Sequence, residues 1–317
     1  MTPLPAPGAD DPILKTVIAG LEMSNPVGLA AGLDKNGEAL EGLSRLGFGA
    51  VECGSVTPRA QPGNPKPRLF RLAEDQAVIN RMGFNNEGLK PFGARLSRRP
   101  TRTPIGANLG ANKETEDKAA DYVIGLKKLA GLADYFTVNI SSPNTPGLRA
   151  LQGREALDDL LGRIHEARPA DGAPVFLKIA PDLIGDEIGM IVEASLAHGI
   201  DALIVSNTTL ERPASLRSAF AGESGGLSGA PLKPFALKAL EAAAEAANGR
   251  LPLIAVGGIA SGEDAFARIR AGASAVQIYS ALIYEGPGLI GRIKRDLAAR
   301  LRAEGFADMA EATSARR

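Results

Sequence analysis

The polar residues that could take part in chemistry lie at the ends of short apolar runs. Lys35 follows one such run and Ser55 ends the next. Asn108 ends a third run, and Lys178 stands within a fifth. A hydrophobic core does not require these hydroxyl, amide and ammonium groups. If the runs are parallel strands of one barrel, their carboxyl ends meet on one face, and these side chains predict a polar binding site there.

Glycine and hydroxyl residues late in the chain predict a phosphate-binding site. Gly225–Gly229, Gly257–Gly258 and Tyr279–Ser280 follow the last three apolar runs. Barrel proteins often bind phosphate with the loops after strands seven and eight, where bare backbone N–H groups reach the anion. Paired glycines also form ordinary tight turns. The prediction therefore depends on these residues lying together at the ends of neighbouring predicted strands.

The sequence does not support several other kinds of site or segment. His165 and His198 fall in predicted helices, so we expect both on the surface and no histidine base. No run end presents a cluster of His, Cys and carboxylates, so no metal site is predicted. The 36 basic and 36 acidic residues balance, so no overall field attracts nucleic acid. No stretch reaches the roughly 20 apolar residues of a membrane span, and the proline-rich start is not a secretory signal.

The elements that must position these residues alternate regularly. Eight short runs rich in β-branched residues predict strands: Asn25–Gly32, Phe48–Val56, Pro104–Gly110, Asp134–Ser141, Ala173–Ala180, Asp201–Thr208, Leu251–Gly258 and Ala275–Ala281. Apolar residues at helical spacing predict helices over Thr115–Ala130, Arg154–Ala167, Asp186–His198, Lys233–Ala247, Glu263–Ala271 and Leu289–Glu304. Eight βα units predict a TIM-type (β/α)8 barrel, with a doubly wound open sheet as the alternative.

Two connections, residues 57–103 and 209–232, are too long for simple crossovers. Both follow predicted strands, so we expect extended loops on the C-terminal face of the barrel. The predicted organisation is a proline-rich N-terminal linker over residues 1–20, the barrel over residues 21–305 and a C-terminal tail over residues 306–317.

Nine ordered segments resemble the dihydroorotate dehydrogenase family, most closely its quinone-linked class 2 branch. They are GLAAGLDKNGE, PRAQPGNPKPRLFRL, NRMGFNNEG, VNISSPNTPGLR, LKIAPDL, SNTT, GGLSG, VGGI and IYSALIYEGP. The resemblance extends from about Leu21 to Leu301. It implies an enzyme that oxidises (S)-dihydroorotate to orotate with FMN as hydride acceptor and a quinone as final acceptor, in de novo pyrimidine (UMP) biosynthesis.

The resemblance also implies a role for each matching residue. Ser142 occupies the catalytic-base position, which class 1 enzymes fill with cysteine, and Thr145 is implied to pass its proton on through a water. The residues implied for dihydroorotate are Lys35, Asn80, Arg81, Met82, Gly83, Phe84, Asn139, Asn144, Asn207 and Thr208. Those implied for FMN are Ala31, Gly32, Leu33, Asp34, Lys35, Ser55, Asn108, Asn139, Lys178, Ser206, Gly229, Gly258, Tyr279 and Ser280.

The chemistry of that reaction explains these residue types. Forming the ring double bond removes a proton from carbon 5 and a hydride from carbon 6, and hydride acceptance requires the flavin because no side chain can perform it. Asparagine amides both donate and accept, which suits a flat amide-rich substrate. Lys35 supplies a fixed charge for the carboxylate or for developing negative charge, and Lys178 does so for the reduced flavin.

Two rival functions and one membrane expectation accompany this interpretation. The rivals are a class 1-like enzyme that uses fumarate or NAD, and a flavin-binding barrel without catalysis. Class 2 enzymes contact the membrane through an amphipathic segment ahead of the barrel, whereas MTPLPAPGADDP resembles only the linker that follows it. We therefore expect peripheral attachment at the cytoplasmic side of the cell membrane through an N-terminal segment not present in this chain, which alone is expected to be soluble.

Overall fold

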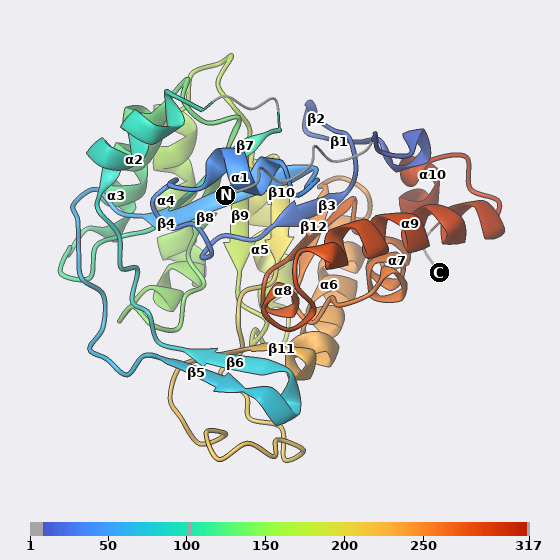
Figure 1. Cartoon of the computed structure of the whole chain (residues 1–317). Helices are drawn as coiled ribbons and strands as arrows, with labels where there is room; N and C mark the ends of the chain where they lie inside the picture. The colour runs from blue at the N-terminus through green and yellow to red at the C-terminus, as the bar shows by residue number, and fades with distance from the viewer. Residues whose placement is uncertain (1–8, 100–102, 316–317) are drawn as a thin grey trace.

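Eight parallel strands form a closed barrel in the computed structural model, which describes residues 9–99 and 103–315. Around the ring the order is β10-β12-β13-β3-β4-β7-β8-β9. The strands are β3 (Val27–Leu29), β4 (Ala50–Val56), β7 (Ile105–Leu109), β8 (Tyr135–Asn139), β9 (Val175–Ile179), β10 (Ala202–Val205), β12 (Leu253–Val256) and β13 (Ala275–Ile278). Each lies within one of the eight predicted runs, so the (β/α)8 barrel is confirmed over the open sheet (Figure 1).

Helices surround the barrel, and all six predicted ones are present. They are α3 (Lys118–Leu129), α4 (Arg154–Ala167), α5 (Glu187–Ala197), α6 (Lys233–Ala247), α7 (Gly262–Arg270) and α9 (Gly288–Ala303). α3 begins later than predicted because Asp117 is its N-cap, with a side chain that accepts from Ala120 N. Short elements not predicted are α1 (Leu40–Ser44), α2 (Leu89–Leu96), α8 (Ser280–Glu285), α10 (Met309–Ser314), and the 3₁₀ turns η1 (Pro12–Leu14), η2 (Ala73–Asp75), η3 (Arg149–Gln152) and η4 (Ala230–Leu232). These spans are too short for a helical period to be distinguished.

The end of the barrel interior nearer the N-termini of the strands is apolar and is closed by a hairpin. Tyr135 and Phe176 stack there with ring centroids 4.9 Å apart. Strands β1 (Thr16–Ile18) and β2 (Leu21–Met23) pair in antiparallel fashion, and Ile18 and Met23 pack into the same cluster. The hairpin crosses the predicted boundary between residues 20 and 21. Residues 1–8 of the predicted linker lie outside the described residues.

The opposite, C-terminal face carries a second sheet. Strands β5 (Leu69–Leu72), β6 (Ala77–Asn80) and β11 (Gly226–Gly229) form it in the order β11-β6-β5. All three come from the two long connections, so the predicted extensions on this face include strands as well as loops. Figure 1 shows this sheet at the end of the barrel away from the hairpin. None of the helices in the described residues is long and apolar enough to cross a membrane.

Candidate active site

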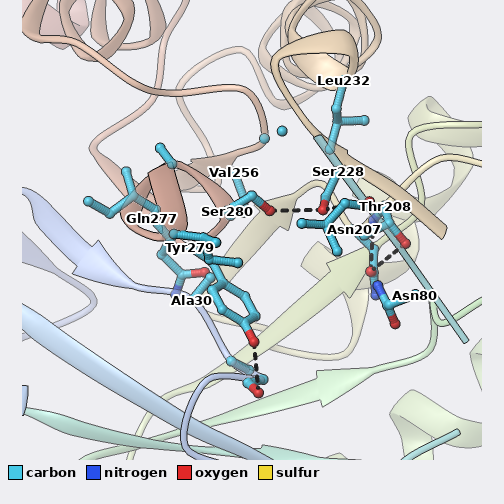
Figure 2. A pocket seen from close by; sticks show the side chains of 18 of the residues that line it. Ala30, Asn80, Asn207, Thr208, Ser228, Leu232, Val256, Gln277, Tyr279 and Ser280 are labelled. Atoms are coloured by element: carbon cyan, nitrogen blue, oxygen red, sulfur yellow. Dashed lines mark hydrogen bonds between the residues drawn. The ribbon is translucent and has the colours of Figure 1, made fainter. Parts of the chain in front are cut away.

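A pocket lies between the carboxyl ends of the barrel strands and the sheet β5-β6-β11 (Figure 2). Residues at or just beyond the ends of seven of the eight strands line it, together with side chains from that sheet. Nineteen of the predicted site residues are among the lining: Ala31, Gly32, Lys35, Ser55, Asn80, Met82, Gly83, Phe84, Asn139, Ser142, Asn144, Lys178, Ser206, Asn207, Thr208, Gly229, Gly258, Tyr279 and Ser280.

Two of the predicted residues after β3 lie outside the lining. Leu33 is exposed. The Asp34 side chain is buried and accepts from the backbone N–H groups of Glu38 (2.9 Å) and Ala39 (2.8 Å). Asp34 therefore holds the loop that presents Lys35.

Arg81 and Asn108 also lie outside the lining. Arg81 pairs with Glu223 at 2.7 Å and stacks over Phe70 at 4.5 Å, which joins the two long connections. Asn108 is fully buried beneath the pocket, where it accepts a hydrogen bond from Ser55. Arg81 and Asn108 therefore do not line the pocket, but they contact residues that support or form its lining.

Amide side chains from separate loops meet in the pocket. Asn207 Nδ2, after β10, donates to Asn139 Oδ1 at 3.2 Å. Asn144 Nδ2, after β8, donates to Asn80 Oδ1 on β6 at 3.2 Å. Each amide retains further donor or acceptor capacity, so the set can bind a flat ligand that carries both kinds of group.

Ser142 lies in the loop after β8 with a buried side chain. Its Oγ accepts from Asn144 N at 3.3 Å. Thr145 Oγ1 is buried and has no hydrogen-bond partner within the described part of the chain. His165 and His198 lie away from this pocket, with His165 Nδ1 3.1 Å from His198 O. Ser142 therefore lines the pocket, whereas neither histidine does.

Two lysines line the pocket, and burial lowers the pKa of both. Burial, aided by the charge of Arg68, lowers the pKa of Lys35 to about 8. Burial also lowers the pKa of Lys178, whereas the buried carboxylate of Glu52 acts in the opposite direction. Lys178 makes no ion pair with a carboxylate of the described residues, so its Nζ can contact a ligand in the pocket.

The end of the pocket near β12 and β13 has the features of a phosphate cradle. Gly258 has φ +68°, and a Cβ there would lie 2.5 Å from Lys233 Cα, so only glycine fits. Ser280 Oγ donates to Ser228 Oγ at 2.8 Å, and Tyr279 OH donates to Gly32 O at 3.2 Å (Figure 2). The glycine and hydroxyl residues from which the sequence predicts a phosphate site therefore lie together at this end of the pocket.

Several lining residues were not assigned as site residues from the sequence. Ser228 lies within the GGLSG motif, which did mark the region, whereas Gln277 lies inside a strand and carries no motif. Leu69 and Ile283 line the pocket yet are 59% and 39% exposed. These two side chains make part of the pocket apolar where it meets solvent.

Comparison with known proteins assigns the chain to a family. A sequence profile described as dihydroorotate dehydrogenase matches residues 13–301. A protein of Rhodospirillum rubrum named dihydroorotate dehydrogenase (quinone) is 58% identical over 311 residues, which cover 97% of this chain and 85% of that protein. A protein of the same name from Xanthobacter autotrophicus is 56% identical over 314 residues, 96% of this chain and 88% of that one.

Solved structures give the same assignment. A crystal structure of DHODH from Eimeria tenella in complex with ferulenol superimposes with a TM-score of 0.93 at 42% identity, covering 98% of this chain and 90% of that one. The ligand-free form from the same organism gives a TM-score of 0.94 at 42% identity, covering 98% and 94%. Fold, pocket and sequence agree, and the chain belongs to the dihydroorotate dehydrogenase family.

Proposed function

We propose that this chain oxidises (S)-dihydroorotate to orotate in its pocket, with FMN as the flavin and a quinone as final electron acceptor. The observation that carries the proposal is the convergence of three groups in one pocket: a glycine and hydroxyl cradle, a set of asparagine amides, and a buried lysine. The relatives named dihydroorotate dehydrogenase (quinone) support the reaction and the acceptor. The cradle supports FMN in particular, because that flavin ends in a phosphate.

The residues fit FMN at both of its ends. Gly229, Gly258, Tyr279 and Ser280 would hold the phosphate, since a side chain at Gly258 would collide with Lys233. Lys178, which lines the same pocket, would lie beside the ring system. When bound, FMN supplies the hydride acceptor that no amino-acid side chain provides. Ala31, Gly32, Ser55 and Ser206 complete the proposed cofactor lining, with Asn108 acting through Ser55.

The substrate side is formed by the amides and by Lys35. Asn80, Asn139, Asn144 and Asn207 would pair with the amide groups of dihydroorotate, and Lys35 would hold its carboxylate. Thr208, together with Met82, Gly83 and Phe84, contributes further lining beside them.

Ser142 is proposed to remove the proton from carbon 5. Serine is a weak base unless another group accepts its proton. Thr145 Oγ1, three residues on, is buried and lacks a protein partner in the described chain, which suits the relay through water that the family resemblance implies.

The first test is spectroscopic. The purified protein should be yellow, and anaerobic addition of dihydroorotate should bleach the flavin absorbance as the flavin is reduced. Released flavin should have the mass of FMN, and a quinone should restore the colour faster than fumarate or NAD. A flavin that is released as FMN but is never bleached would identify a binding protein without catalysis.

The second prediction concerns the base. Ser142→Ala should retain FMN yet lose about 10²–10⁴-fold in the rate of flavin reduction, because a positioned base contributes that factor. Wild-type reduction should accelerate with rising pH, since serine is a poor base. Stopped-flow absorbance measures both, and Ser97→Ala on the exposed end of α2 is the matched control. Equal rates in Ser142→Ala and wild type would remove Ser142 from the role.

The third prediction follows from the pKa of Lys35, which burial lowers to about 8. Below that pH the ammonium is charged and attracts the carboxylate of orotate, and above it the charge is lost. Orotate affinity should therefore fall about tenfold between pH 7 and pH 9, the loss expected when one protonation state binds. Titration of the flavin spectrum with orotate measures it. Lys35→Met should bind weakly at every pH, and a wild-type affinity that is flat with pH contradicts the assignment.

The fourth prediction concerns the acceptor. Leu69 and Ile283 expose apolar surface at the pocket, which suits a lipid-soluble quinone. Independently of these two residues, we propose that the protein contacts the cytoplasmic face of the cell membrane peripherally. Reduced protein should be reoxidised faster by quinone when Leu69 is intact than in Leu69→Asp, while a small soluble dye should oxidise both equally. Equal reoxidation by quinone would contradict an acceptor site here. Flotation with vesicles tests the membrane contact separately, because it requires no turnover.

A further inference from the structure

Glu52 is a fully buried carboxylate inside the barrel, below the pocket, to which the proposed reaction assigns no role. It lies on β4 with 0% of its surface exposed. It accepts hydrogen bonds from Asn108 Nδ2 at 2.7 Å, Thr137 Oγ1 at 3.0 Å and Gln277 Nε2 at 2.9 Å, with Tyr135 OH at 3.4 Å. These donors come from three other strands, β7, β8 and β13. One side chain thus joins four of the eight strands.

A carboxylate can only accept hydrogen bonds, and this fixes the amides that touch it. An amide side chain can present either its oxygen or its nitrogen, and its partners decide which. Asn108 and Gln277 must both turn their NH₂ groups toward Glu52. Their carbonyl oxygens then face away from the carboxylate, and Asn108 Oδ1 accepts from Ser55 Oγ and from Asn139 Nδ2 at 3.2 Å.

The orientation passes from Asn108 into the pocket. Asn139 Nδ2 donates to Asn108 and to Ser55 Oγ, the latter at 3.1 Å, so Asn139 Oδ1 points the other way. There it accepts from Asn207 Nδ2 at 3.2 Å. Asn207 Oδ1 in turn accepts from Thr208 N at 2.7 Å. The acceptor-only carboxylate at the start of this series fixes Asn108, and at its far end the backbone N–H groups of Ser141 and Thr208 donate to Asn139 Oδ1 and Asn207 Oδ1 in the same sense.

Gln277, the second amide that Glu52 holds, has an unpaired oxygen. Gln277 is 4% exposed and lines the pocket beside Tyr279 and Ala30 (Figure 2). Its Nε2 is held by Glu52, and its Oε1 is buried with no hydrogen-bond partner among the described residues. A buried carbonyl without a donor is unfavourable, so an occupant that brings an O–H or N–H group is favoured. A flavin mononucleotide carries both, in its ribityl chain and in its ring.

We propose that Glu52 is a positioning residue that sets the donor and acceptor polarity of the pocket amides. In this arrangement Gln277 Oε1 accepts a hydrogen bond from an O–H or N–H group of the bound flavin. The inference rests on the proposed function, because it takes the flavin and orotate as the occupants. Glu52 itself touches neither, and it acts through Asn108 and Gln277.

The test uses purified holoenzyme with Glu52→Gln, which keeps the size of the side chain but can also donate. Two opposite amide orientations then become available, so orotate affinity should fall about ten- to hundred-fold, the effect of one unsatisfied buried group. FMN should be released at a lower temperature, as followed by its fluorescence. Thr137→Val is the matched control, since it removes one bond to Glu52 at the same depth without touching an amide, and its orotate affinity should stay within about threefold.

Gln277→Leu distinguishes the contact of Gln277 with the flavin from the series that runs from Asn108 to Asn207. It is also the variant to measure if Glu52→Gln does not fold. It should release FMN more easily while orotate affinity changes by less than about threefold, because the series from Asn108 to Asn207 is intact. A Glu52→Gln holoenzyme that is less stable but binds orotate normally overturns the proposal, and so does unchanged FMN release from Gln277→Leu. If the wild type itself shows no spectral response to orotate, the proposed function fails instead.

Discussion

A closed ring of parallel strands encloses an interior that its own side chains must fill, and this requirement shapes the rest of the molecule. The chain meets it with two different layers. The layer nearer the hairpin β1–β2 is apolar. Tyr135 stacks on Phe176 there, and the hairpin closes this end of the barrel. The layer nearer the pocket is polar and contains Glu52 with Asn108, Thr137 and Gln277. This polar layer lies between the apolar layer and the carboxyl ends of the strands, so it lies beneath the pocket, and Gln277 reaches the pocket lining.

Burial of a polar layer is favourable only where its groups are paired, since an unpaired buried group costs about 1–3 kcal/mol. Glu52 receives its donors from strands β7, β8 and β13, so the pairing also restrains those strands relative to one another. Four buried side-chain atoms of the described residues lack a partner, and two of them, Thr145 Oγ1 and Gln277 Oε1, belong respectively to the proposed proton relay and to the pocket lining. The network therefore leaves acceptors where a ligand or water can use them.

The sheet β5-β6-β11 turns an open barrel end into a pocket. It brings Asn80, at the end of β6, against Asn144 from the loop after β8. The pair of Arg81 with Glu223 holds the two long connections together beside it. The sheet also contributes Leu69 to the lining, so the element that carries the proposed substrate amide Asn80 also adds exposed apolar surface to the pocket.

The sequence alone determined the barrel and most of the lining. Apolar β-branched runs and helical periodicity are local signals, so eight strands and six helices were predicted within a few residues, and residues at strand ends must share one face. Tertiary structure decided what depends on distant partners. Strand β11 pairs with β6, which lies far from it in the sequence, so neither short segment identifies its partner. Glu52 is one charge in an apolar run, and only barrel closure surrounds it with donors. Asp34 and Arg81 lie in family motifs and Asn108 ends a predicted strand, yet side-chain packing directs all three away from the pocket, because sequence position does not specify side-chain orientation.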